Sequence, residues 1–364
     1  MQNVRAMVIA SVAAFLLPLQ LQAQNTKPAP KAKTVQWSTI NKMGALFPSM
    51  LIANSVRTPP GNVPATLKGD PYGLLGVHIR TVEPDSNLVV TIKVPEFAET
   101  TAFKFKLATP GEYDVFPRIH WDYEKLRKAT QPVPAIVTFS VTLNDQSLGQ
   151  RSSPMRVQSV NDVPLSVKMD SGERLDTSWM FVAFVNEEHP WIDKLLAESI
   201  KSGHVKSFVG YQRGPEQASK QVEAIYDTLK KRGIVYSSIT TTSSPNTQVS
   251  TQHVRFLSDS VGNSQANCID GVVLMASILR KIGIQPIIIL GPGHAMLGYR
   301  EDPKKPREII VVETTMIGSA PFDKAVKAGD IKFKQWSTAK PVSPYFREID
   351  VAKFRAAGVM PISR

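Results

Sequence analysis

The sequence contains very little cysteine: a single residue, Cys268, in a chain of 364. One cysteine cannot close a disulfide within the chain, nor can it form the cysteine-rich sites that bind zinc or iron–sulfur clusters. The six histidines include no HExxH pair, and no cluster of His, Asp and Glu has metal-ligand spacing. No GxxxxGK[ST] or GxGxxG loop is present, so nucleotide chemistry has no sequence support. We therefore expect no metal and no cofactor.

Acidic residues are fewer than basic ones, with 31 Asp and Glu against 43 Lys and Arg and a formal net charge of +12. This balance favours acidic partners such as nucleic acid, anionic lipid or acidic glycans, but it does not choose among them. Hydrophobic residues make up 42% of the chain, which is ample for a globular core. At roughly 100–200 residues per domain, the length suggests two domains.

The first residues narrow the choice of partner. A positive start through Arg5, an apolar run over residues 6–17 and a plausible cleavage site at 21–23 predict a secretory signal peptide over residues 1–23. The apolar run is shorter than the ~20 residues of a spanning helix, so we expect no transmembrane segment after signal removal. Residues 24–34 are rich in Pro and Lys and predict a linker. We expect an exported, periplasmic or extracellular protein, with envelope polymers rather than nucleic acid as its electrostatic neighbours.

The remaining chain shows two kinds of hydrophobic pattern. Over residues 35–170, alternating runs separated by turn residues predict a β-sandwich domain of immunoglobulin-like size. Its clearest strands are expected at 77–82, 88–94, 103–107 and 136–143. Over residues 171–364, helices come first and an antiparallel set of strands follows, which predicts an α+β domain. These helices are expected at 187–202, 217–232 and 268–282, each followed by glycine, and the strands at 286–290, 294–299 and 309–313.

Cys268 has the most informative setting in the sequence. It opens the third predicted helix, where unpaired backbone N–H groups and the helix dipole stabilise a thiolate. A nucleophilic thiolate also needs a base and a carboxylate that orients the base. His294 begins one predicted strand and Glu313 ends another, so antiparallel pairing of these strands beside the helix would bring the three side chains together. The alternative is a buried cysteine that packs as a small apolar group, and composition alone favours this alternative.

Three short segments, ANCIDG at 266–271, PGHA at 292–295 and ETT at 313–315, follow one another in the chain. They resemble the transglutaminase-like superfamily of cysteine enzymes, and its bacterial members in particular. The resemblance covers about residues 180–330 and extends upstream through segments at 185–192, 208–212 and 252–258. It implies a papain-related α+β core with a triad of Cys268, His294 and Glu313. Many members have Asp at the third position, so Glu313 leaves the length of the orienting contact open.

The resemblance also implies a reaction. Cys268 would attack a peptide or carboxamide carbonyl, with His294 as the base and Glu313 orienting its ring. The Cys268 backbone N–H and one further donor would stabilise the oxyanion, and Gln252 and Asn267 are weak candidates for that donor. The triad does not decide between water and an amine as acceptor, and we favour hydrolysis of a protein or peptide substrate. A second hypothesis is a catalytically silent binding or scaffold protein of the envelope, and the oligomeric state stays open.

Other polar and aromatic residues have a structural interpretation and a functional one. Asp270 is expected to cap the start of the third helix, with an acid–base role as the alternative. Trp191 and Tyr211 are expected in the core, although they could line a substrate groove. His253 is expected to pack or to face solvent.

Overall fold

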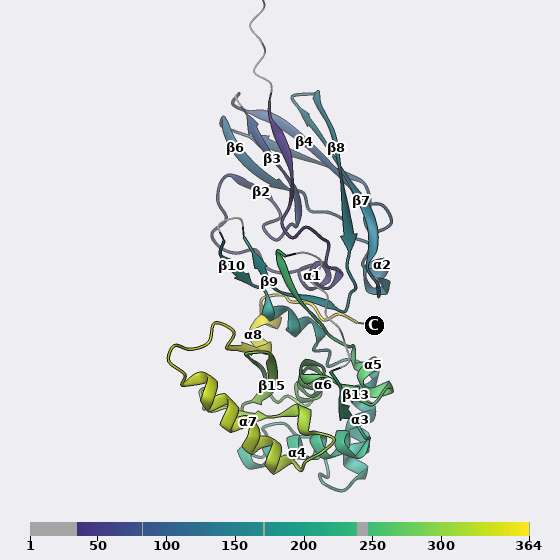
Figure 1. Ribbon diagram of the computed structural model, residues 1–364, viewed down its shortest axis with the longest axis vertical. Coiled ribbons are helices and arrows are strands. Elements are labelled where there is room, and N and C mark those ends of the chain that lie inside the picture. The colour runs from purple at the N-terminus through teal and green to yellow at the C-terminus, as the bar shows by residue number, and fades with distance from the viewer. Residues whose placement is uncertain (1–34, 82, 170–171, 239–246, 364) are drawn as a thin grey trace, which may run out of the picture. The chain divides into compact units, whose positions relative to one another are not determined.

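The structure is a computed structural model that describes residues 35–81, 83–169, 172–238 and 247–363 (Figure 1). Both the predicted signal peptide (1–23) and the predicted linker (24–34) lie outside the described residues. The described chain is a mixed α+β protein with several sheets, antiparallel sheets among them. The α+β class predicted from the sequence is therefore confirmed.

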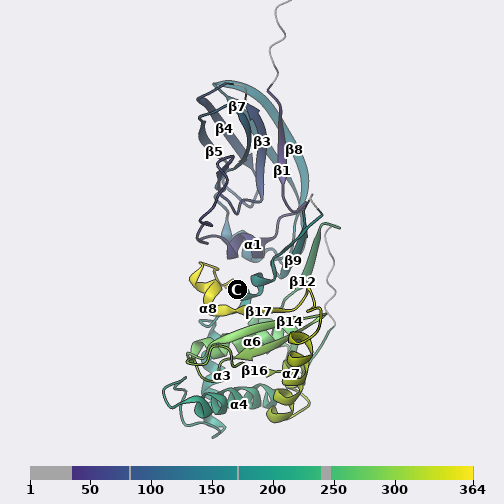
Figure 2. The same cartoon turned by 90° about the vertical axis from the view of Figure 1, so that its left-hand side faces the viewer.

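Two four-stranded sheets lie between residues 37 and 157 (Figures 1 and 2). One has the order β1 (Trp37–Asn41), β3 (Leu75–Thr81), β6 (Gly111–Phe116) and β2 (Leu67–Gly69). The other has the order β5 (Thr101–Leu107), β4 (Ser86–Lys93), β7 (Val133–Leu143) and β8 (Gln146–Val157). Leu88, Val90 and Ile92 alternate with exposed or half-buried residues along β4, so this strand buries one face. Two short helices, α1 (Pro48–Ala53) and α2 (Tyr123–Lys128), lie in the connections.

The four strands predicted in this region correspond to β3, β4, β5 and β7. The predicted bounds of these four strands agree with the structure to within a few residues. Apolar and polar residues alternate along them because each strand turns one face toward the interior. β1, β2, β6 and β8 were missed. Most residues of β8 are exposed, so its sequence lacks the apolar alternation by which the other strands were recognised.

A three-stranded sheet connects the earlier and later parts of the chain. β9 (Asp162–Lys168) pairs antiparallel with β10 (Arg174–Asp176) on one side and with β12 (Val249–His253) on the other. The predicted domain boundary at residues 170–171 lies outside the described residues, between β9 and β10. One hydrophobic cluster includes buried residues from Trp37 to Ile362. The segments on either side of that boundary therefore share a sheet and a core.

The three helices predicted in the second half are present as α3 (Pro190–Lys201), α4 (Pro215–Lys231) and α6 (Cys268–Lys281). Each ends two residues before a glycine in the left-handed region, with φ of +83° at Gly203, +76° at Gly233 and +80° at Gly283. Glycine adopts this conformation without the steric cost that a Cβ imposes, so it ends a helix well. Shorter elements lie between them: η1 (Ser178–Phe184), α5 (Leu257–Gly262), and the parallel pair β11 (Val235–Tyr236) and β13 (Gln265–Ala266).

The last sheet has the order β16 (Ile310–Val312), β15 (His294–Tyr299), β14 (Pro286–Gly291) and β17 (Arg347–Asp350), with every pairing antiparallel. α6 packs against β14 and β15. Ile288 belongs to the core that contains α6, whereas Ile287 and Ile289 pack in a separate cluster with Phe333 and Trp336 of α7 (Phe322–Ser337). Because both faces of β14 are covered, its sequence is a continuous apolar run rather than an alternating one.

The C-terminal region differs from the prediction in two ways. The strands are not the last elements, because α7, β17 and α8 (Val351–Ala356) follow β16, and Figures 1 and 2 both place α7 beside the sheet. α7 was missed because only Ala325 and Gly329 are buried in it, which leaves a weak apolar pattern. The strand predicted to end at Glu313 stops at Val312. Glu313 instead caps η2 (Thr314–Met316), where its side chain accepts a hydrogen bond from the Thr315 N–H at 3.2 Å.

Candidate active site

Cys268 is the first residue of α6, and its side chain is partly buried. A capping box holds this helix start: Asn267 Oδ1 accepts from the Asp270 N–H, and Asp270 Oδ2 accepts from the Asn267 N–H, both at 2.9 Å. Arg255 donates its backbone N–H and its guanidinium to the Asp270 carboxylate, each at 2.8 Å. Burial raises the pKa of Asp270, although these hydrogen bonds oppose the shift. The capping role predicted for Asp270 is confirmed, and it fixes the backbone that carries Cys268.

His294 is the first residue of β15 and pairs with Gly291 across the β14–β15 turn. Gly293 within the turn has φ of +67°, which a residue with a Cβ adopts only at a cost. The hairpin packs on α6, and His294 and Cys268 line the same cavity, where the interaction with Cys268 raises the pKa of His294. His294 Nε2 is 2.8 Å from Glu313 Oε2. That contact engages Nε2, so Nδ1 is the ring nitrogen that does not contact Glu313.

Glu313 is buried, with 3% of its side chain exposed, and both of its carboxylate oxygens accept hydrogen bonds. Oε2 accepts from His294 Nε2 at 2.8 Å and from Lys332 Nζ at 2.7 Å. Oε1 accepts from the Thr315 hydroxyl at 2.6 Å. These contacts hold the carboxylate in one orientation, with its charge directed at the imidazole ring.

The electrostatics of this group follow from its contacts. Hydrogen bonds with Cys268 and then Glu313 raise the pKa of His294 to about 9, against the opposing effect of burial. Burial on its own would raise the pKa of Glu313, but the hydrogen bonds from His294, Lys332 and Thr315 outweigh burial and lower the pKa to about 2. At neutral pH Glu313 is therefore ionised and His294 is predominantly an imidazolium, so a positive charge lies next to the sulfur.

Two residues of α7, Lys332 and Trp336, belong to this group and were not identified from the sequence. Trp336 makes an edge contact with the His294 ring, with centroids 6.2 Å apart. A Cβ on Gly291 would lie 2.4–2.5 Å from the Trp336 ring, so glycine is required for the indole to pack on the hairpin. The spacing of Lys332 and Trp336, one helical turn apart, is a signal of a shared face. No pattern in the sequence near Lys332 and Trp336 predicts that this face of α7 packs close to Cys268.

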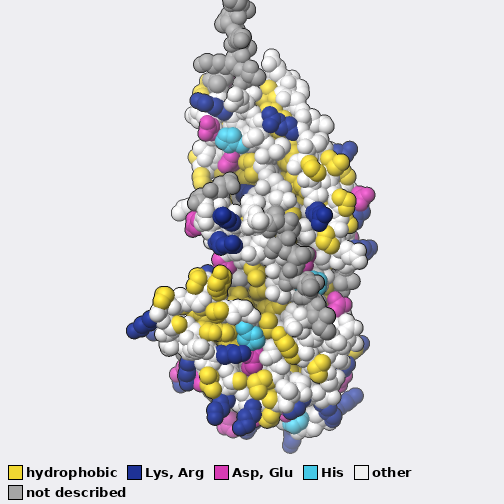
Figure 3. All heavy atoms as spheres, viewed as in Figure 1, with side chains coloured by type: hydrophobic (Ala, Val, Ile, Leu, Met, Phe, Trp, Pro, Cys, Tyr) yellow, Lys and Arg dark blue, Asp and Glu magenta, His cyan; other side chains and the backbone are white. Residues whose placement is uncertain are grey.

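A cavity of about 540 Å³ lies at Cys268 and His294. One group of lining residues belongs to the β10–β9–β12 sheet and is largely polar: Leu165, Ser166, Arg174, Asp176, Ser250 and Gln252. The other group surrounds the nucleophile and is largely apolar: Ile269, Leu290, Gly291, Ala295, Pro344 and Tyr345. Tyr345 is 68% exposed, so the cavity is open to solvent at this residue. On the face in Figure 3, hydrophobic side chains gather over the region of α8 and β15.

The two candidate oxyanion donors have different surroundings. Gln252 lines the cavity together with Cys268, and its Nε2 donates to the His253 carbonyl at 2.9 Å. Asn267 is 6% exposed, and its Oδ1 is engaged in capping α6. Gln252 is therefore the candidate with access to a bound substrate.

The remaining residues considered from the sequence lie elsewhere. Trp191 is partly buried against the core and lies under the Arg232 guanidinium. The Tyr211 hydroxyl donates to the Arg300 carbonyl at 2.8 Å and accepts from a backbone N–H. His253 Nδ1 is 3.2 Å from Asp162 Oδ1. None of Trp191, Tyr211 and His253 lines the cavity at Cys268.

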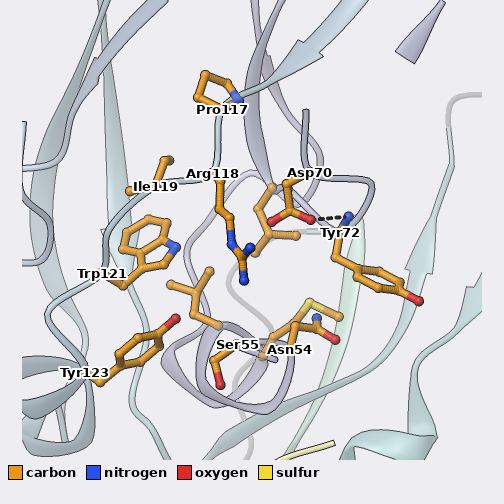
Figure 4. Close-up of a pocket in the computed structure, with 13 residues that line it drawn as sticks. Asn54, Ser55, Asp70, Tyr72, Pro117, Arg118, Ile119, Trp121 and Tyr123 are labelled. Carbon is orange, nitrogen blue, oxygen red and sulfur yellow. Dashed lines mark hydrogen bonds between the residues drawn. The ribbon is translucent and has the colours of Figure 1, made fainter. Parts of the chain in front are cut away.

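A second cavity lies beside α1, and its volume is about 50 Å³ (Figure 4). The Arg118 side chain points into it between Asp70 and the rings of Trp121 and Tyr123, and Asp70 accepts a hydrogen bond from the Tyr72 N–H at 2.9 Å. This volume holds a few water molecules and no peptide.

A third cavity, of about 380 Å³, lies at Glu124, Asn186 and His189. The cavity at Cys268, with about 540 Å³, is larger than both and contains the candidate nucleophile.

Within the described ranges, no three His, Cys, Asp or Glu side chains are grouped so that they could hold a metal ion. No helix among the described residues has the length and apolar character needed to span a membrane. No protein-family model matches the sequence, and no curated protein matches it.

Proposed function

We propose that the chain is an exported, transglutaminase-like cysteine enzyme that cleaves peptide or carboxamide bonds. The supporting observation is the His294 ring, which lines one cavity together with Cys268 and whose Nε2 is 2.8 Å from the buried carboxylate of Glu313. A nucleophile, a base and an orienting acid in contact are the parts that acyl transfer requires. In this proposal residues 35–170, which include the two four-stranded sheets, form the N-terminal β-sandwich domain, and residues 171–364 form the transglutaminase-like domain.

The proposed reaction begins with the sulfur. His294 takes the proton of the Cys268 thiol, and the sulfur attacks the carbonyl carbon of the substrate. The negative charge that develops on the carbonyl oxygen is stabilised by the Cys268 backbone N–H and, in this proposal, by Gln252. When the C–N bond breaks, His294 gives its proton to the leaving amine and a thioester remains on Cys268. Glu313 stays ionised throughout, and it holds the ring with Nδ1 toward the sulfur.

The second half of the reaction releases the acyl group. His294, now neutral, removes a proton from water as the water oxygen attacks the thioester carbonyl. The C–S bond then breaks, a carboxylic acid leaves, and His294 returns to the sulfur the proton that it took from water. Hydrolysis is favoured over transfer to an amine because the cavity is open at Tyr345, so water can reach the thioester.

The test uses p-nitrophenyl acetate, an ester that acylates reactive thiols without any particular substrate recognition. We expect a burst of p-nitrophenol, about one per chain, followed by slower turnover, and an acetylated Cys268 detected by mass spectrometry. His294→Gln should reduce the burst rate by a factor on the order of 10². Glycinamide added during turnover distinguishes the acceptors, because acyl transfer would produce N-acetylglycinamide.

The control is Cys268→Ala, which should fold and give no burst. A wild-type protein that shows no burst while its melting temperature is normal would overturn the proposal. That result would instead support a catalytically silent binding or scaffold protein.

A further inference from the structure

Arg174 supplies a guanidinium to the cavity that contains Cys268. Its Nη1 donates to Ser166 Oγ at 3.1 Å and to Ser250 Oγ at 3.4 Å. No carboxylate of the described residues forms an ion pair with it. The two serine contacts use only Nη1, so Nε and Nη2, the side of the guanidinium that binds a carboxylate with two parallel hydrogen bonds, stay available.

The other guanidinium in the cavity, that of Arg347, does have an acidic partner. Arg347 forms an ion pair with Asp176, whose carboxylate also accepts the Ser178 N–H at 2.9 Å. The charges of Arg347 and Asp176 therefore compensate each other. With His294 as an imidazolium, the lining carries net positive charge, and Arg174 is the cation that has no acidic partner among the described residues.

The surroundings of Arg174 also suit an anionic group. The hydroxyls of Ser166 and Ser250 orient the guanidinium and can rotate to donate to a second acceptor. Arg174 is itself exposed, so an anionic ligand can reach it from solvent, and Leu165, Phe181 and Leu290 give the same cavity an apolar part.

We propose that the cavity binds a substrate that carries a carboxylate, with Arg174 pairing with this group while the scissile carbonyl lies at Cys268. That the bound molecule is a substrate rests on the proposed function. The binding of a carboxylate at Arg174 does not depend on it. The carboxylate is either an acidic side chain or the C-terminus of a peptide. Ser166 and Ser250 position the guanidinium, and the apolar lining contacts the part of the substrate between the two charged ends.

The test uses the one cysteine of the chain as the reporter, so each labelling event is assigned without ambiguity. Three maleimides differ only in their ends: maleimidopropionyl-glycinamide is neutral, maleimidopropionyl-glycine has a terminal carboxylate, and maleimidopropionyl-glutamic acid α-amide has a side-chain carboxylate. We expect at least one acid to label Cys268 faster than the neutral amide. The faster acid identifies the source of the carboxylate.

Arg174→Gln should reduce this preference for the acid roughly three- to tenfold, the size expected of a partly exposed charged hydrogen bond. Its rate with the neutral amide should stay within about twofold of wild type. Arg213→Gln is the matched control, since Arg213 does not line the cavity, and its preference should be unchanged. Asp176→Asn should increase the preference, because it frees the charge of Arg347.

Equal rates for the three reagents in the wild-type protein would overturn the anion site. A preference that survives Arg174→Gln in a protein with a normal melting temperature would overturn it as well. An acid preference that depends on Arg174, together with no p-nitrophenol burst, would support the anion site and overturn the proposed enzyme activity. The two proposals can therefore fail separately.

Discussion

Lys332 Nζ lies 2.7 Å from Glu313 Oε2, the oxygen that also accepts the His294 ring N–H at 2.8 Å. A lysine and a histidine therefore share one carboxylate oxygen at the base of the candidate site. The lysine is 41% exposed and comes from α7, whereas the carboxylate is buried. α7 thus influences the charge of a ring that it contacts only at the edge.

Removal of this lysine should change the titration of the histidine. In Lys332→Met the carboxylate interacts with the imidazolium alone and a repelling cation is gone, so the pKa of His294 should rise above about 9. The rise should be less than about one pH unit, because ion pairs this exposed are worth about 1 kcal/mol or less. NMR titration of the His294 ring protons measures it. Lys334→Met, which removes a lysine paired with Asp330, is the control, and an unchanged or lower pKa in Lys332→Met would contradict this reasoning.

His294 should also make the stability of the fold depend on pH. Its pKa is about 9 in the folded chain and about 6.5 in an unfolded one, so folding favours the protonated ring. The resulting stabilisation, at most about 3 kcal/mol, is complete below pH 6.5 and is lost as pH rises through 9. Urea unfolding of wild type and His294→Gln at pH 6 and pH 10 measures it. The difference in free energy of unfolding between the two proteins should shrink at pH 10, and a constant difference would refute the assignment.

Substitution of Asp270 should lower the free energy of unfolding, because this residue has a structural role. Its side chain is fully buried, and it pairs with Arg255 and caps the helix that carries Cys268. Asp270→Ala leaves the guanidinium without its partner and should lower the free energy of unfolding by about 3–5 kcal/mol. Asn267→Ala, which removes a single cap acceptor, should cost about 1 kcal/mol. Equal costs in urea unfolding would mean that the buried ion pair contributes nothing beyond capping.

Gly291 should tolerate no side chain. A Cβ at this position would lie 2.4–2.5 Å from the Trp336 ring, so Gly291→Ala has to displace the indole from the hairpin. We expect a loss of about 1–3 kcal/mol in the free energy of unfolding and slower labelling of Cys268. Gly262→Ala is the control, because nothing lies within 4 Å of its added Cβ. A stable Gly291→Ala protein with normal labelling would show that the indole does not restrain the hairpin.

The parts of the site that the sequence made predictable are those with a local signal. Cys268 follows Asn267, whose pairing with Asp270 is the pattern of a helix start, and His294 follows a turn marked by two glycines. Glu313 was placed at the end of a strand, and it lies one residue beyond the end of β16. Each of these residues is close in the chain to the feature that positions it.

The parts that were missed depend on contacts between distant segments. Lys332 reaches Glu313 because α7 packs against β16, and a single sequence does not show this packing. Ser166 and Ser250 are neighbours because β9 pairs with β12, two strands about 80 residues apart in the chain. The sequence carries no local mark of such a pairing, since any two short strands of similar pattern could form it.

The pairing of β9 with β12 has a consequence for the order in which the site is completed. Ribosomes make proteins from the N-terminus, so Ser166 and Arg174 exist long before Cys268, and Tyr345 and Arg347 are added after it. A growing chain carries the thiol before it carries the histidine, the carboxylate and α7. Cys268 therefore gains these neighbours only after the chain has grown through α7, and a chain that ended between Cys268 and His294 would contain the thiol without the residues that the proposed activity needs.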